Sequence, residues 1–153
     1  MLLLFIIKCY YIKNKTHVRP FMLLQELTAR DLMNTKVISV HPADKVAAVD
    51  LLMVRKVLGG VPIVDDTEKI VGILTSRDIM ISRLRTSIAG MPVDTIMTKN
   101  PITVDPDAPL EKILGLMLSH EIERIPVVEN DKLVGLIDEF SVLSTIYEKI
   151  ISQ

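Results

Sequence analysis

Apolar residues recur along the chain at spacings that predict helices and strands in a regular order. In the segment 110–118 they follow the i, i+3, i+4, i+7, i+8 pattern of one helix face, and 46–53 shows a similar pattern. The apolar runs 61–74 and 125–137 are each interrupted by a short acidic turn. These runs predict two β-hairpins whose strands are buried on both faces.

Shorter segments complete the pattern in each half of the chain. The extended runs 37–40 and 101–104 come before the first helices, and further helices are predicted over 77–85 and 140–150, directly after the hairpins. Each half therefore reads as β-α-β-β-α, and the predicted fold class is α+β.

The two halves form an internal repeat, in which equivalent residues lie 64 positions apart up to the hairpin turn and 63 positions apart after it. The recurring apolar and proline positions are Met33, Ile38, Val40, Pro42, Leu52, Met53, Pro62 and Val64, matched by Met97, Ile102, Val104, Pro106, Leu116, Met117, Pro126 and Val128. A short linker with Gly90 and Pro92 separates the halves. We expect an N-terminal extension over 1–24, repeat 1 over 25–88 and repeat 2 over 89–153.

The repeated motif points to a family. A strand of the form h-P-h-V, where h is apolar, an acidic turn and then h-h-G-h-h occur twice in register. The first copy continues as T-x-x-D, and "MTKNP" comes before the second copy. Residues 31–150 thereby resemble a tandem cystathionine β-synthase (CBS) domain pair. The resemblance implies two βαββα repeats packed sheet to sheet about a pseudo-two-fold axis. It also implies a non-catalytic regulatory module that binds adenosine compounds in the clefts between the repeats.

The two copies differ where the second hairpin strand meets the last helix: Thr75 and Asp78 in repeat 1 correspond to Asp138 and Ser141 in repeat 2. Thr-x-x-Asp is the pattern of a helix capping box, which is a purely structural interpretation. Asp138 is an equally good N-cap, so capping alone does not require Thr-x-x-Asp. A carboxylate at Asp78 can also accept both hydroxyls of a ribose, and Thr75 offers a neutral donor to a phosphate at the helix N-terminus.

The same difference makes the second cleft the poorer nucleotide site, because Asp138 repels phosphate and Ser141 cannot accept two hydroxyls. By the family resemblance, the cleft of Asp78 is completed by Ile73, by Asn100 and Ile102 against adenine, and by Arg124 on phosphate. Arg124 also has a simpler interpretation, an exposed side chain that pairs locally with neighbouring glutamates. The phosphate role is favoured, because the equivalent residue in repeat 1 is a glycine.

The resemblance leads us to expect AMP, ADP or ATP as ligand, with S-adenosylmethionine less favoured. We also expect a homodimer of two stacked pairs and an effector protein that the sequence does not identify. The alternative is a ligand-independent module for dimerisation and protein interaction.

Composition narrows the alternatives. The chain has 153 residues, 49% of them hydrophobic, and a net charge of -1, which fits a globular protein with a sizeable core. A single cysteine, Cys9, excludes an internal disulfide and indicates a reducing cytoplasm. The three histidines lack partners at ligand spacing, so no metal site is expected. Because neither a nucleophile with its base nor a glycine-rich phosphate loop is found, no enzyme activity is predicted either.

The first 20 residues carry four basic side chains, no acidic side chain, and seven apolar residues at their start. The apolar run is too short for a transmembrane helix, and its charges follow it, unlike those of a secretory signal. Two interpretations of this segment remain. It is either a strand that touches a membrane or binds a partner, or a segment outside the core, in which case translation starts at Met22. Without these 20 residues, 14 basic and 19 acidic side chains give a net charge of -5, which argues against nucleic-acid binding. We expect neither a nucleic-acid nor a membrane partner.

Overall fold

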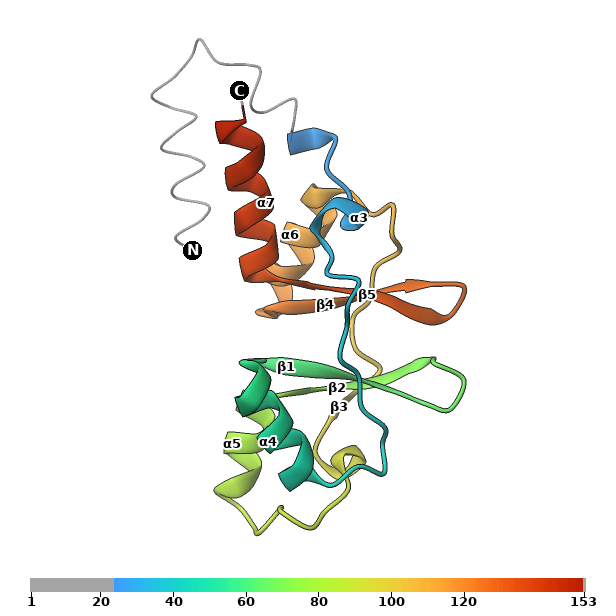
Figure 1. The fold of residues 1–153 in the computed structure, drawn as a ribbon, viewed down its shortest axis with the longest axis vertical. Helices are drawn as coiled ribbons and strands as arrows, with labels where there is room; N and C mark the ends of the chain where they lie inside the picture. The colour runs from blue at the N-terminus through green and yellow to red at the C-terminus, as the bar shows by residue number, and fades with distance from the viewer. Residues whose placement is uncertain (1–23, 153) are drawn as a thin grey trace.

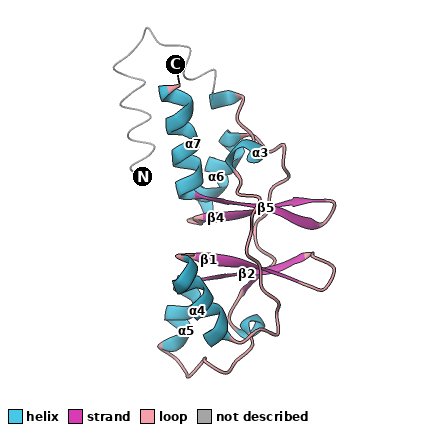
Figure 2. Cartoon of the chain, viewed as in Figure 1, coloured by secondary structure: helices cyan, strands magenta, loops and turns pink. Residues whose placement is uncertain are grey.

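The computed structural model describes residues 24–152, and its two repeats lie one above the other with their sheets facing (Figure 1). Each repeat places two helices on the outer side of a hairpin. In repeat 1 these elements are α4 (Val46–Lys56), β1 (Gly60–Val64), β2 (Ile70–Thr75) and α5 (Ser76–Arg83). In repeat 2 they are α6 (Leu110–His120), β4 (Arg124–Glu129), β5 (Lys132–Asp138) and α7 (Glu139–Ile151). The predicted α+β class is confirmed, and Figure 2 shows the same alternation of helices and strands.

The two hairpins have the same register, which confirms the repeat alignment. Gly60 pairs with Thr75 in repeat 1, and Arg124 pairs with Asp138 in repeat 2, at the equivalent positions. Both ladders also shift register at the same place, between residues 63 and 64 and between residues 127 and 128. The backbones of the two hairpins therefore pair in the same way at equivalent positions.

The predicted first strands are shorter than expected, because each is reduced to one bridging residue. Val40 bridges to the first hairpin strand of repeat 1, and Val104 bridges to that of repeat 2, both in parallel orientation. Val40 exchanges hydrogen bonds with the Pro62 carbonyl at 3.1 Å and the Val64 amide at 3.0 Å. Pro62 has no N–H to continue this ladder toward earlier residues, so the pairing ends there. Pro126 does the same in repeat 2.

Each repeat has its own hydrophobic core, but the cores exchange segments. Helix α3 (Ala29–Leu32), expected in repeat 1, lies in the core of repeat 2, where Leu32 packs with Ile113 and Val142. The segment between the repeats, including the 3-10 helix Val93–Thr95, packs into the core of repeat 1 instead. The two repeats are therefore held together by exchanged segments as well as by the contact between their sheets.

Hairpin burial is uneven. Strand β1 is buried at every position, as predicted, whereas β5 is only partly buried, so the prediction of strands buried on both faces is wrong for β5. Strand β2 lies between β1 and β3 (Thr98–Lys99), whereas β5, beyond its hairpin partner β4, makes only isolated bridges with Asn34 and Lys69.

The turns of the two hairpins touch each other at one end of the interface between sheets. The Leu133 N–H donates to the Glu68 carbonyl at 3.2 Å, and Lys132 Nζ lies 2.9 Å from a carboxylate oxygen of Glu68. The opposite end of the interface, where the last helices begin, is where Thr75, Asp78 and Arg124 lie. Across residues 24–152, no helix is long and apolar enough to cross a membrane.

Candidate functional site

The predicted motif of repeat 1 forms a capping box at the start of α5. Oδ2 of Asp78 accepts hydrogen bonds from the Thr75 N–H at 2.8 Å and from the Thr75 hydroxyl at 2.6 Å. The Asp78 N–H in turn donates to the Thr75 hydroxyl oxygen at 3.2 Å. The hydroxyl hydrogen of Thr75 is thus used within the cap. The described residues make no hydrogen bond to the other carboxylate oxygen, Oδ1 of Asp78.

Repeat 2 caps its last helix with different side chains. The Ser141 N–H donates to Asp138 Oδ1 at 2.8 Å, and the Asp138 N–H donates to the Ser141 hydroxyl oxygen at 3.1 Å. A third box, Thr28 with Asp31, caps α3 with the same two residue types as the box of α5. Capping is therefore complete in both repeats, as expected, and it does not explain why only repeat 1 has a carboxylate at the third helical position.

Arg124 reaches across from repeat 2 to the cap of repeat 1. A Cβ atom at Gly59 would overlap the guanidinium of Arg124, and one at Gly60 would lie 3.1 Å from Cδ of Arg124 and 3.3 Å from Cγ2 of Thr75. The carbonyl of Gly59 also accepts a hydrogen bond from the N–H of Ser76, the first residue of α5, at 3.1 Å. The arginine and the N-terminus of α5 thus share one corner of the interface between repeats.

The repeat pattern indicated the glycine at position 60, but Gly59, on which the guanidinium of Arg124 lies, was not predicted from the sequence. The sequence does contain two adjacent glycines where a strand begins, and glycine at such a position often marks a close approach by other atoms. Because these two glycines have no side chains, the arginine can occupy the space beside them.

Arg124 is also paired within its own repeat. Nη1 of Arg124 donates to a carboxylate oxygen of the adjacent Glu123 at 3.1 Å. The side chain of Arg124 is only 21% exposed, whereas that of Glu123 is 65% exposed. A charge pair with one well-solvated partner is weak, so the guanidinium can exchange this carboxylate for another anion at small cost. The local-pairing interpretation is therefore seen in the structure without excluding the other.

Of the three predicted adenine contacts, Ile73 belongs to β2 and Asn100 lies beside the start of that strand. Strand β3 pairs with β2, with Thr98 opposite Ile73, and the Asn100 N–H donates to the Val71 carbonyl at 3.4 Å. Asn100 has a φ of 49°, a left-handed conformation that asparagine tolerates better than most residues, and its side chain is exposed. Ile102 follows and is half-buried.

Ile73 points toward the opposite sheet. It is 8% exposed, but its neighbour Leu74 belongs to the core between the sheet and the helices of repeat 1. Because consecutive side chains of a strand point to opposite faces, Ile73 lies on the face between the two repeats. From the level of Val71, beside Asn100, to Thr75 the strand rises about 13 Å. This is the length scale of a nucleoside monophosphate.

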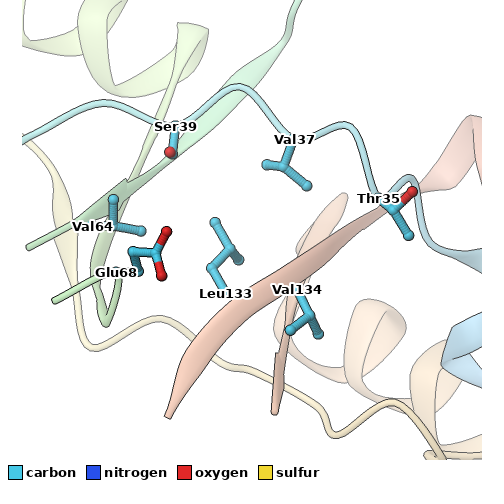
Figure 3. A pocket seen from close by; sticks show the side chains of 7 residues that line it. All are labelled: Thr35, Val37, Ser39, Val64, Glu68, Leu133 and Val134. Atoms are coloured by element: carbon cyan, nitrogen blue, oxygen red, sulfur yellow. The ribbon is translucent and has the colours of Figure 1, made fainter. Parts of the chain in front are cut away.

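A separate cavity of about 190 Å³ lies near the hairpin turns (Figure 3). Its lining residues are Thr35, Val37, Ser39, Val64, Glu68, Leu133 and Val134. None of the six predicted site residues lines it, and neither do Asp138 and Ser141. This cavity was not predicted from the sequence. In residues 24–152, no group of three or more His, Cys, Asp or Glu side chains could hold a metal ion.

Comparison with known proteins agrees with this architecture. A solved structure of CBSX2 in complex with AMP matches 79% of this chain and 96% of its own, with a TM-score of 0.71 and 27% identity. The CBS domain pair of protein MJ0100, in complex with 5'-methylthioadenosine and S-adenosyl-L-methionine, matches 77% of this chain and 98% of its own, with a TM-score of 0.72 and 25% identity.

Sequence comparison extends the same result. The chain is 32% identical over 131 residues to Hypoxic response protein 1 of Mycobacterium tuberculosis. This alignment covers 82% of the chain and 90% of that protein. The family model of the CBS domain matches twice, at residues 29–84 and 93–148. The chain therefore belongs to the CBS domain family and carries two CBS domains in tandem.

Proposed function

We propose that this CBS pair is a non-catalytic regulatory module that binds an adenine nucleotide, AMP, ADP or ATP, in the corner formed by Thr75, Asp78 and Arg124. The observation that carries the proposal is the position of Arg124 from repeat 2, on Gly59 and beside the N-terminus of α5 in repeat 1. A cation and a helix N-terminus at one place favour a phosphate group. The complexes of similar CBS pairs with AMP and with S-adenosylmethionine support an adenosine ligand.

Each predicted residue has a role in this arrangement. Asp78 accepts the ribose hydroxyls, using the oxygen that the cap leaves without a partner. Thr75 holds that carboxylate in place through its own hydrogen bond and contacts phosphate only if its hydroxyl rotates away from Asp78. Asn100, Ile102 and Ile73 surround the adenine further along β2, and Arg124 binds the phosphate.

Calorimetric titration of the full chain with AMP, ADP, ATP, S-adenosylmethionine and GMP tests the proposal. We expect the adenine nucleotides to bind, with GMP much weaker because its base differs. S-adenosylmethionine should bind more weakly than AMP, because Arg124 attracts a phosphate and repels the sulfonium cation. Binding of none of the five compounds would refute the nucleotide site.

The alternative is a module that dimerises and docks an effector protein without a ligand. It is supported by apolar side chains that remain exposed on the helices of both repeats, including Leu84 and Phe140. We propose that the protein acts as a homodimer in either case, and that a partner protein reads its state. Light scattering at micromolar concentration, with and without AMP, tests the dimer, and a one-chain mass under both conditions would refute it.

A further inference from the structure

Helix α7 carries a row of exposed apolar side chains along one side. Phe140, Leu143, Tyr147 and Ile151 are spaced i, i+3, i+7 and i+11, so all four lie within one narrow stripe of the helix surface. Their side chains are 79%, 50%, 61% and 59% exposed. The core of repeat 2 is filled from another side of the same helix. A stripe of this kind is typical of a surface that contacts another protein.

Helix α5 and its C-cap residue, Leu84, carry the equivalent surface in repeat 1. Met80, Ile81 and Leu84 are exposed, while Ile79 on the other side of the helix is buried. Through the repeat offset of 63, Met80 and Leu84 correspond to Leu143 and Tyr147 of α7. The two repeats thus expose matching apolar surfaces, which we call the α5 stripe (Met80, Ile81 and Leu84) and the α7 stripe (Phe140, Leu143, Tyr147 and Ile151).

The segments that contain the outer helices of the two repeats have net charges of opposite sign. In repeat 1, the segments 45–57 and 75–88 contain six basic and two acidic side chains, a net charge of +4. In repeat 2, the equivalent segments 109–121 and 138–151 contain five acidic and two basic side chains, a net charge of -3 with His120 neutral. The overall net charge of -1 conceals this difference between the two helix faces.

One pair of equivalent positions lies directly beside the stripes. Arg85, after the end of α5, corresponds to Glu148 in α7, and both are exposed. Neither makes an ion pair within the described residues, whereas Arg83 is already paired with Asp50 inside repeat 1. If α5 packed against α5 of a second copy, Arg85 would approach its own equivalent, and Glu148 would do the same. Like charges at an interface oppose association and suppress that arrangement.

We propose that two copies of this chain associate head to tail, with the α5 stripe of one copy against the α7 stripe of the other. This inference rests on the proposed homodimer and adds its orientation. A two-fold axis repeats the contact, so that both stripes of each copy are covered at once and the assembly closes as a dimer. The basic face of repeat 1 then meets the acidic face of repeat 2, with Arg85 near Glu148 of the second copy.

Cross-linking of single-cysteine variants distinguishes the orientations. In a Cys9→Ser background, Leu84→Cys and Tyr147→Cys are each prepared as full chains; both original side chains are exposed, so folding is not expected to suffer. Each variant is treated with a short bismaleimide, alone and after the two are mixed and allowed to exchange subunits. Head-to-tail association predicts cross-linked dimers only in the mixture. Cross-linking of either variant alone, at the yield of the mixture, would overturn the orientation.

Charge reversal gives a second test, in variants that keep Cys9. Arg85→Glu and Glu148→Arg should each raise the dimer dissociation constant roughly tenfold, because each places like charges at both copies of the contact. The double variant should restore the original value. A one-chain mass for the unmodified protein would refute the homodimer itself, whereas a dimer whose affinity ignores these changes would refute only the orientation. Nucleotide binding is measured separately and is independent of both outcomes.

Discussion

Replacing Asp78 by alanine should weaken both the fold and the nucleotide site, and the two losses can be separated. In the structure, Oδ2 of Asp78 accepts two hydrogen bonds from Thr75, so the variant loses the carboxylate half of the capping box, which costs about 1 kcal/mol, while the backbone N–H of residue 78 can still donate to the Thr75 hydroxyl. For a domain of this size that is a fall of roughly 2–4 °C in melting temperature. Losing the ribose contact, a hydrogen bond to a charged group, costs on the order of 1.5–3 kcal/mol, or about tenfold to a hundredfold in affinity for AMP.

Two matched variants isolate these effects. Asp78→Ser copies Ser141 of repeat 2, whose hydroxyl accepts the cap hydrogen bond from the Asp138 N–H at 3.1 Å. It should keep most of the stability and lose affinity as Asp78→Ala does. Asp31→Ala removes the same kind of cap from α3, where Asp31 accepts from the Thr28 N–H at 2.8 Å. It should lower the melting temperature and leave AMP affinity unchanged.

Calorimetric titration and thermal unfolding on the same samples provide both numbers. If Asp78→Ser bound AMP as tightly as the unmodified chain, the carboxylate would have no role in the ligand site. Asp78 would then be a helix cap and nothing more. If Asp31→Ala lost affinity as well, the loss in the Asp78 variants would reflect general destabilisation of the fold.

Four further predictions follow from the same geometry. Arg124→Ala should lower affinity for AMP at least about tenfold but leave adenosine binding nearly unchanged in titrations, because adenosine has no phosphate. The unmodified chain should bind one nucleotide tightly, and Asp138→Thr combined with Ser141→Asp should strengthen a second site, seen as a rise in calorimetric stoichiometry. A chain starting at Met22 should melt, dimerise and bind as the full chain does; a melting temperature several degrees lower would show that the removed residues stabilise the body. The Thr67 hydroxyl lowers the pKa of Asp65 by hydrogen bonding, so this contribution to stability is present above about pH 4 and is lost as the pH falls further; Asp65→Asn should lack that part of the pH dependence of the melting temperature.

The repeat and its elements could be read from the sequence because each depends on local periodicity. Helices α4 and α6 lie where the apolar spacing predicted them, and the hairpins pair in the register that the 64- and 63-residue offsets require. The helices after the hairpins begin at Ser76 and Glu139, one residue before the predicted starts. Short-range patterns of this kind can be recognised without knowledge of the tertiary fold.

The parts that the sequence did not predict depend on contacts between distant segments. Nothing in the pattern around Leu32 shows that it joins the core of repeat 2, because an apolar residue is equally compatible with either core. The first strands are short because Pro62 has no N–H to extend the pairing with Val40. Predicting this from the sequence would require knowing that Val40 lies beside Pro62. The cap bond that occupies the hydroxyl of Thr75 likewise depends on a rotamer, which a sequence pattern does not specify.

The position of Arg124 also explains why the two repeats cannot be identical at this corner. Gly60 and Arg124 are equivalent in the repeat, yet a Cβ atom at Gly60 would lie 3.1 Å from Cδ of Arg124, so the two equivalent positions face each other across the interface. An arginine at both would require two guanidinium groups in the space that one now fills. Glycines at 59 and 60 leave that space to the single arginine, which then lies against the repeat whose cap carries Asp78. Under the proposed function, this arrangement predicts one good nucleotide site and one poor site in this chain.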